Sequence, residues 1–320
     1  MLALLGVTLF FAGNCCLAKK TYDSTKDDRY RNIFLRAKKD TPSEEFKYAQ
    51  KLQKRGRKRS ARRHYKAVVK HWPTSLEAPD AQLEIARMLD KKGKKSAAFD
   101  ACQVLFDRYP GRFPAEEILK QQFRLANEVM EKKKMRILFG GLPDPEAAVP
   151  LFEKIVKNAP EWERTPEAQY LIGKAYEDSN TLEMAVPAYH LIELEYPDSP
   201  LAPEAAFRKC RLLSKLSEKK KNDNELMEKA FSAAALFVAQ YPDSEYFNAA
   251  VLLKKRLYDR RAVFAFKSAK FYDNIKGKEN AALTAYQRMV KHFPDSTWTA
   301  KAKQRIVVLE ILVGDQDEKI

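Results

Sequence analysis

Residues 165–200 read TPEAQYLIGKAYEDSNTLEMAVPAYHLIELEYPDSP and hold two helix-forming segments followed by a proline. Ala185 stands twelve residues before Pro197, and Tyr189 stands eight residues before it. An alanine allows two antiparallel helices to cross at a short distance, and a large residue one turn later lies on the same face. Proline cannot continue a helix, so it ends the second segment. The stretch therefore predicts one antiparallel helix pair.

The same pattern recurs along the chain. Six prolines each have an alanine twelve residues earlier: Ala61, Ala98, Ala148, Ala185, Ala230 and Ala282. The residues eight before the prolines are mostly large: Tyr65, Cys102, Phe152, Tyr189, Ala234 and Tyr286. Successive prolines lie 37, 50, 37, 45 and 52 residues apart. A tetratricopeptide repeat has about 34 residues, so we expect longer helices or inserted loops in the later units.

This pattern resembles the tetratricopeptide repeat. The signature is fullest in one unit, where Gly173, Tyr176, Ala185, Tyr189 and Pro197 fall at the family's spacing. Asp-Ser follows three of the prolines, and we expect its side-chain oxygens to cap the next helix. These pairs are Asp198-Ser199, Asp243-Ser244 and Asp295-Ser296.

The expected fold is all-α, a tetratricopeptide-repeat superhelix of about five to six helix pairs with a C-terminal capping helix. With 10 glycines and no sustained alternation of apolar residues, the chain does not read as a sheet-rich class. The expected helices are 43–55 with 58–70, 79–91 with 95–108, 114–138 with 146–158, 165–178 with 181–195, 203–218 with 224–240, 245–274 with 279–292, and a last one near 296–312.

The N-terminus differs from the rest. Leu2–Ala12 is an uncharged apolar run that would span roughly 16 Å as a helix, too short for a membrane span. We interpret residues 1–18 as a secretory or lipoprotein signal, although no Lys or Arg precedes the run and a buried amphipathic segment is the alternative. Residues 19–42 read as a flexible tether, 43–200 as N-terminal repeats, and 201–320 as C-terminal repeats with the capping helix.

Cys15 and Cys16 follow the apolar run and are candidate lipidation sites. Neither has the leucine three residues earlier that a lipoprotein cysteine usually has, so the alternative is that both leave with the signal. Cys102 and Cys210 are too few for a disulfide framework. We expect Cys102 to be a buried thiol, and a bridge between the two would have to join distant repeats.

Two further stretches resemble the BamD family, lipoproteins of the outer-membrane β-barrel assembly machinery. One is Ile137–Ala148, where an aromatic-glycine loop interrupts the third repeat. The other runs from Lys255 through Phe271-Tyr272 to a turn at Gly277, and continues to Tyr286 and to His292–Ser296. The resemblance covers roughly residues 43–312, and the chain is longer than the family's five-repeat form.

The resemblance implies a place on the periplasmic face of the outer membrane, with a lipid anchor where one of the cysteines is modified. There the protein would dock the barrel-forming assembly subunit and receive unfolded outer-membrane proteins. A different periplasmic tetratricopeptide adaptor, in cell division or polysaccharide export, is the alternative. The resemblance leaves the ligands, the oligomeric state and the true translation start open.

Signatures of catalysis are missing from the sequence. It contains no Gly-rich phosphate loop, no metal-spaced Cys and His cluster and no G-x-S-x-G motif. His64 and His71 share a helix without a carboxylate or cysteine at ligand spacing. We therefore expect no enzyme activity, no cofactor and no metal.

The net charge of +16 is concentrated in runs. Eight of the thirteen residues from Lys51 to Arg63 are basic, and other clusters include Lys91–Lys95, Lys219–Lys221 and Lys254–Arg261. They are either solvated rims or surfaces that attract anionic lipid or acidic partners. Nucleic acid is disfavoured, because the runs lack interleaved aromatic residues.

First helices line the inner face of a tetratricopeptide array. By repeat register, the candidate residues of an exposed peptide groove are Phe46, Gln50, Leu83, Arg87, Tyr170 and Lys174. This combination suits an extended peptide with apolar side chains and a free carboxylate, although the same residues could pack within a repeat. Phe271 and Tyr272 are candidates for partner docking, with a place in the core as the favoured alternative.

Overall fold

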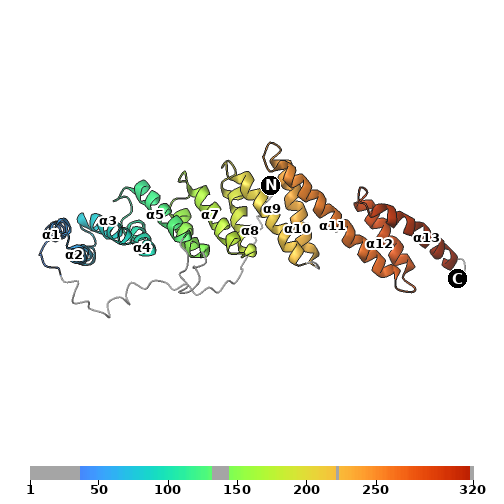
Figure 1. Cartoon of the computed structure of the whole chain (residues 1–320), viewed down its shortest axis with the longest axis horizontal. Coiled ribbons are helices and arrows are strands. Elements are labelled where there is room, and N and C mark those ends of the chain that lie inside the picture. The colour runs from blue at the N-terminus through green and yellow to red at the C-terminus, as the bar shows by residue number, and fades with distance from the viewer. Residues whose placement is uncertain (1–36, 132–143, 221–222, 318–320) are drawn as a thin grey trace, which may run out of the picture. The chain divides into compact units, whose positions relative to one another are not determined.

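The computed structural model describes residues 37–131, 144–220 and 223–317, which contain thirteen α-helices and one short 3-10 helix (Figure 1). No strand occurs in these three segments. The chain forms two compact units, one ending at Ser75 and the other beginning at Leu76. Among the residues described, six helix pairs precede a last helix, so the predicted all-α tetratricopeptide fold is confirmed.

The first unit holds one helix pair, α1 (Pro42–Lys54) and α2 (Lys58–His71). The Glu45 carboxylate is fully buried, accepts hydrogen bonds from the backbone N–H groups of Lys38 and Lys39, and lies 2.7 Å from Nδ1 of His64. The sequence shows no carboxylate at ligand spacing from His64, but the structure pairs His64 with Glu45 of the neighbouring helix. Glu45 is nineteen residues away in sequence, and the pairing of the two helices brings the side chains together.

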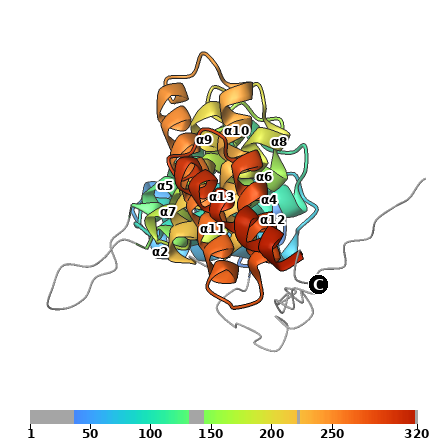
Figure 2. The same ribbon diagram turned by 90° about the vertical axis from the view of Figure 1, so that its right-hand side faces the viewer.

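The second unit contains the remaining helices, each packed against the next. They are α3 (Glu77–Asp90), α4 (Lys95–Arg108), α5 (Ala115–Met130), the 3-10 turn Pro145–Ala148 with α6 (Val149–Asn158), α7 (Thr165–Asp178), α8 (Leu182–Glu195), α9 (Ala202–Lys219), α10 (Asn224–Gln240), α11 (Phe247–Asp273), α12 (Glu279–His292) and α13 (Thr299–Asp317). Figure 2 gives a second view of α11, α12 and α13, in which α12 packs on both its neighbours.

The repeated alanines lie where the helices meet. All six have 0% exposed surface, and the six residues one turn later are at most 1% exposed. Because a larger side chain at the alanine positions would hold the helices apart, the buried methyl groups set the close approach within each pair. The prediction made from their spacing is confirmed.

Each repeat proline ends its helix through the residue that precedes it, which leaves the helical conformation. In α8 the last helical residue is Glu195, and Tyr196 turns to φ −136° and ψ 53° before Pro197. The same backbone conformation recurs before Pro294, where Phe293 has φ −129° and ψ 55°. The proline ring clashes with a helical conformation of the preceding residue, so the helix stops two residues early.

Three details of the prediction are wrong. Ser199 Oγ accepts a hydrogen bond from Leu201 N–H at 3.2 Å, within the turn, and does not cap α9, whose N-cap residue is Leu201. Ser296 bonds the N–H of Trp298 in the same way, so α13 begins at Thr299 and not near residue 296. Helix α5 ends at Met130 and not at residue 138 as expected, and the part of the predicted aromatic-glycine loop up to residue 143 lies outside the described residues.

Candidate functional site

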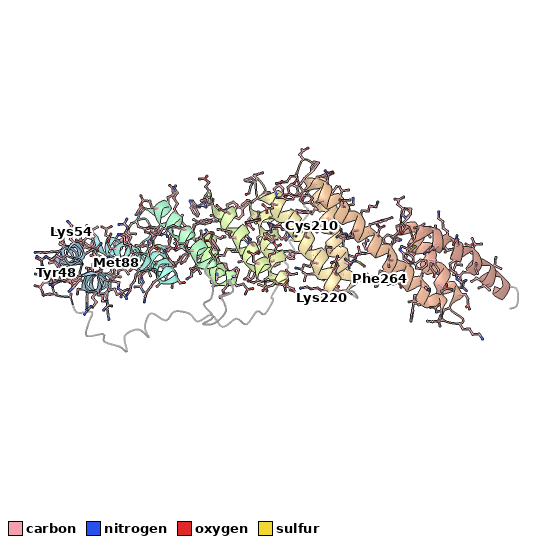
Figure 3. All side chains as sticks on the ribbon, in the orientation of Figure 1. Tyr48, Lys54, Met88, Cys210, Lys220 and Phe264 are labelled. Carbon is pink, nitrogen blue, oxygen red and sulfur yellow. The ribbon has the colours of Figure 1, made fainter. Side chains whose placement is uncertain are left out.

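Helix α11 has 27 residues and presents one open face. Its N-terminal half packs on α10, and α12 packs along it as well. Between these contacts, side chains recur every three or four residues on one side: Leu252, Lys255, Arg256, Asp259, Arg260, Val263, Phe264 and Lys267. That spacing places them on a single stripe of the helix. Figure 3 labels Phe264 on this helix and Cys210 on α9.

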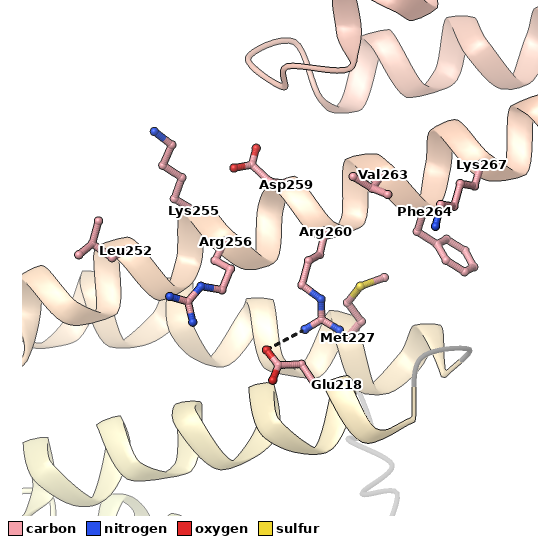
Figure 4. Close-up of a pocket in the computed structure, with 10 residues that line it drawn as sticks. All are labelled: Glu218, Met227, Leu252, Lys255, Arg256, Asp259, Arg260, Val263, Phe264 and Lys267. Atoms are coloured by element: carbon pink, nitrogen blue, oxygen red, sulfur yellow. Dashed lines mark ion pairs between the residues drawn. The ribbon is translucent and has the colours of Figure 1, made fainter.

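The stripe borders a groove of about 610 Å³, completed by Glu218 of α9 and Met227 of α10 (Figure 4). A smaller hollow of about 230 Å³ continues from it across α9 to α7. The two share Glu218 and Arg256. We call the larger cavity the α11 groove. With the smaller hollow it follows α7, α9 and α11, the first helices of three successive repeats.

Arg260 is held in place at the wall of the α11 groove. Its guanidinium donates to the hydroxyl and the carbonyl oxygen of Ser217 at 3.0 and 3.2 Å, and lies 3.7 Å from Glu218. In Figure 4, Arg260 points toward Glu218, to which the dashed line joins it, and Met227 lies beside it. These contacts give the groove one cation with a fixed orientation.

The other cations of the site have no ion-pair partner among the residues described. They are Lys255, Arg256 and Lys267 in the groove, and Arg211 and Lys215 in the adjoining hollow. The acidic residues are Glu177, Glu218 and Asp259, and the first two already pair with Arg208 and Arg260. The site therefore carries unneutralised positive charge.

Apolar side chains accompany this charge. Leu252 is 66% exposed and Phe264 is 37% exposed, whereas Met227 is buried. Exposed aliphatic and aromatic groups next to unpaired cations are features of a protein-binding surface.

A partly buried polar network joins the helices beside the groove. The Tyr189 hydroxyl donates to Glu177 at 2.8 Å, the Tyr170 hydroxyl donates to Glu204 at 2.5 Å, and Arg208 donates to both carboxylates at 3.0 and 2.9 Å. Burial raises the pKa of Glu204, but the hydrogen bonds from Tyr170 and Arg208 outweigh it and hold that pKa below its ordinary value of 4.5. Burial also raises the pKa of both tyrosines. The network joins α7, α8 and α9 and is structural.

Two of the predicted groove residues are not exposed. Leu83 is 8% exposed and Tyr170 is 9% exposed. The Tyr170 ring packs 5.6 Å from the ring of Tyr189, and its hydroxyl is taken up by Glu204. The expectation of exposure is wrong for this pair; Tyr170 is covered by Tyr189 of its own repeat and by Glu204 of the next repeat.

The remaining predicted groove residues lie at least partly on the surface. Gln50 is exposed, and the half-buried Phe46 packs its ring 5.5 Å from that of Tyr65. Arg87 pairs with Glu84 and Lys174 pairs with Asp178, both at 2.9 Å. The structure does not bring the side chains of α3 and α7 together, and α1 belongs to the other unit. Their role in peptide binding stays a prediction.

Phe271 and Tyr272 lie at the end of α11 and are 64% and 40% exposed. Their rings contact each other at 5.7 Å. The interpretation of these two aromatic residues as core is wrong, and their docking role stays a prediction. Cys15 and Cys16 lie outside the described residues.

The α11 groove was not among the predicted sites, although its basic run Lys254–Arg261 is visible in the sequence. The helical spacing of Leu252, Arg256, Val263 and Lys267 was the available signal.

Within the described segments, no helix is long and apolar enough to span a bilayer, and no group of three His, Cys, Asp or Glu residues could hold a metal ion.

Comparison with protein families gives two matches. The model of the YfiO family, described as outer membrane lipoprotein, matches residues 143–310 and so contains the whole α11 groove. The chain belongs to this family. A tetratricopeptide-repeat model matches residues 47–113. Family membership thus supports a tetratricopeptide-type outer-membrane lipoprotein that binds other proteins.

Solved structures share low identity with the chain. A MamA fragment from Desulfovibrio magneticus RS-1 is 16% identical, with 65% of this chain and 98% of that chain covered and a TM-score of 0.27. The C-terminal part of a TPR repeat-containing protein from Cytophaga hutchinsonii is 15% identical, with 83% and 88% covered and a TM-score of 0.30. A tetratricopeptide repeat protein from Parabacteroides merdae is 15% identical, with 84% and 98% covered and a TM-score of 0.29. The search of curated proteins found no match.

Proposed function

We propose that this protein is a periplasmic protein-binding scaffold of the outer-membrane β-barrel assembly machinery. In this role it docks the barrel-forming subunit and receives unfolded barrel proteins, and it binds without catalysing a reaction. Membership of the outer membrane lipoprotein family supports the compartment and the class of role. The observation that carries the proposal is the α11 groove with its adjoining hollow: cations without an ion-pair partner among the described residues lie on α9 and α11, and the exposed apolar side chains Leu252 and Phe264 lie beside them on α11.

Site-specific crosslinking tests this role. A photoreactive residue in place of Lys255 reports on the groove, and one in place of Lys91, on the exposed turn after α3, is the control. In intact cells the groove position should crosslink to the barrel-forming subunit or to an unfolded barrel protein, and the control position should not. Crosslinks only to cell-division or polysaccharide-export proteins would replace the proposal with the other adaptor role.

We also propose a lipid anchor at Cys15 or Cys16. A labelled fatty acid should be incorporated into the natural chain and lost in the variant that lacks the modified cysteine, with Cys15→Ser and Cys16→Ser tested separately and together. Incorporation that survives in the double variant would rule out both residues. Fractionation of the same strains would show whether the protein leaves the outer membrane when the label is lost.

A further inference from the structure

We infer that the α11 groove binds a short amphipathic helix that carries acidic side chains, supplied by a partner protein. This inference rests on the proposed scaffold function and names the chemistry of the ligand. It follows from three properties of the groove: one wall is a continuous helix, several of its cations have no ion-pair partner among the described residues, and its exposed apolar side chains are about three helical turns apart.

The lining favours a helical ligand over an extended one. The backbone of α11 is paired within the helix, so it offers no edge to which a strand could add. An extended peptide would have to place its N–H groups against side-chain acceptors, and among the described residues that line the groove the carboxylates are Glu218 and Asp259. A helix satisfies its own backbone, and its side chains fit between the residues of the stripe as in ordinary helix packing.

The charges favour an acidic ligand. Lys255, Arg256 and Lys267 have no ion-pair partner in the described parts of the chain, and Arg260 is oriented by Ser217. Carboxylates on one face of the ligand would neutralise these cations. Arg256 and Arg260 are four residues apart, so acidic residues one turn apart on the ligand face them both.

Apolar contacts set the length of the ligand. Leu252 and Phe264 are twelve residues apart, roughly 18 Å along the helix. Met227 of α10 lines the groove beside the stripe and is buried, so it forms an apolar floor. A ligand with apolar residues about three turns apart and carboxylates between them matches this order. The flat headgroup layer of an anionic membrane does not fill a groove between helices as a single rod does.

Defined peptides test the inference with the full chain. The first is an acidic amphipathic helix of about 18 residues, long enough to cover the stripe. The second has the same sequence with Lys in place of Glu, and the third is the acidic peptide with a proline at its centre. Anionic and neutral phospholipid vesicles are the remaining probes. We expect the acidic helix to bind and each of the two altered peptides to bind at least tenfold more weakly.

Two matched double variants locate the binding. Lys255→Glu with Arg256→Glu reverses two groove cations, and Lys91→Glu with Lys92→Glu makes the same change of charge on the exposed turn after α3. The groove variant should weaken binding of the acidic helix about tenfold or more, and the control should change it less than about twofold. Leu252→Ser tests the apolar contact without a change of charge and should weaken binding severalfold. Unchanged helicity and urea midpoints show that the variants remain folded.

The other outcomes overturn the inference. Equal binding of the proline-containing peptide would show an extended ligand, and equal binding of the basic peptide would remove the charge argument. Binding to anionic vesicles alone, lost in the groove variant, would assign the groove to a membrane surface. If no peptide binds but barrel-assembly proteins still crosslink, this inference fails and the proposed function stands. If the acidic helix binds but those crosslinks are missing, the proposed function fails instead.

Discussion

Gly173 of α7 lies against the ring of Tyr189 of α8, so closely that a β-carbon at Gly173 would stand 2.7 Å from two ring carbons. The ring is fully buried and cannot move aside. In the second repeat, Ala86 takes the place of the glycine, and the residue sixteen positions later is the smaller Cys102. In the first repeat, however, Ala49 stands sixteen residues before the full-sized Tyr65, so the close contact at Gly173 reflects the spacing of α7 and α8 in this one repeat.

Gly173→Ala should lower the free energy of unfolding by about 1–2 kcal/mol. Overpacking costs about 1–3 kcal/mol, and the gain in helix propensity returns up to about 1 kcal/mol. Urea unfolding measures the difference. Gly314→Ala in α13 is the control, because nothing lies within 4 Å of a β-carbon there and the change should be neutral or stabilising. A Gly173→Ala protein more stable than the natural one would contradict the close contact.

Protonation of the Glu204 carboxylate should account for part of the decrease in the free energy of unfolding in acid. Its pKa is below 4.5 in the folded protein, so its contribution is fully present above that pH and is lost as the pH falls through the folded pKa. Glu204→Gln removes the carboxylate that accepts from Tyr170 and Arg208. We expect the variant to be less stable than the natural protein at pH 7, and the difference to shrink at pH 3.

Urea unfolding at both pH values measures that difference. Glu225→Gln is a suitable control, because the Glu225–Lys229 pair is on the exposed surface of α10 and contributes little to stability. A Glu204→Gln difference that stays constant between pH 7 and pH 3 would mean that the network does not depend on the charge of Glu204.

The helix boundaries were predictable because one local pattern repeats. Ala185 indicates where two helices cross, Tyr189 fills the space between them, and Pro197 indicates where the second helix ends. Each of these effects acts within a few residues of the chain. Where the pattern is missing, prediction failed. The capping expected of Ser199 was wrong because its hydroxyl satisfies a nearer N–H in the turn.

The site was less predictable, because exposure depends on the packing of neighbouring repeats. Repeat register correctly placed Tyr170 on a first helix. In the structure its hydroxyl donates to Glu204 of the next repeat, and the side chain is buried. Conversely, Phe271 was interpreted as core and is exposed, because α12 and α13 contact the face of α11 that holds Ala269 and Asp273 and leave Phe271 uncovered. Pairing is also nonlocal: nothing in the sequence distinguishes the unpaired Arg256 from Arg260, which Ser217 holds.

Cys102 and Cys210 should be unreactive toward thiol reagents in the folded protein. Both are buried and free, and burial raises the pKa of each thiol to about 12, so little thiolate exists at pH 8. In a protein with Cys15→Ser and Cys16→Ser, we expect no rapid labelling in buffer and labelling of two thiols in denaturant. Rapid native labelling at either position would show that its repeat opens frequently.

Charge reversal at Arg87 and Lys174 tests the groove predicted from repeat register. The probe is an extended peptide with apolar side chains, an aromatic C-terminal residue and a free carboxylate. Arg87→Glu with Lys174→Glu should weaken its binding, but only about threefold for each residue, because each cation is already paired with Glu84 or Asp178 on its own helix. The Lys91→Glu, Lys92→Glu protein supplies the control for net charge.

Unchanged affinity would remove Arg87 and Lys174 from the binding surface. A larger loss in the Lys255→Glu, Arg256→Glu protein would show that the unpaired cations of the α11 groove attract this ligand more strongly.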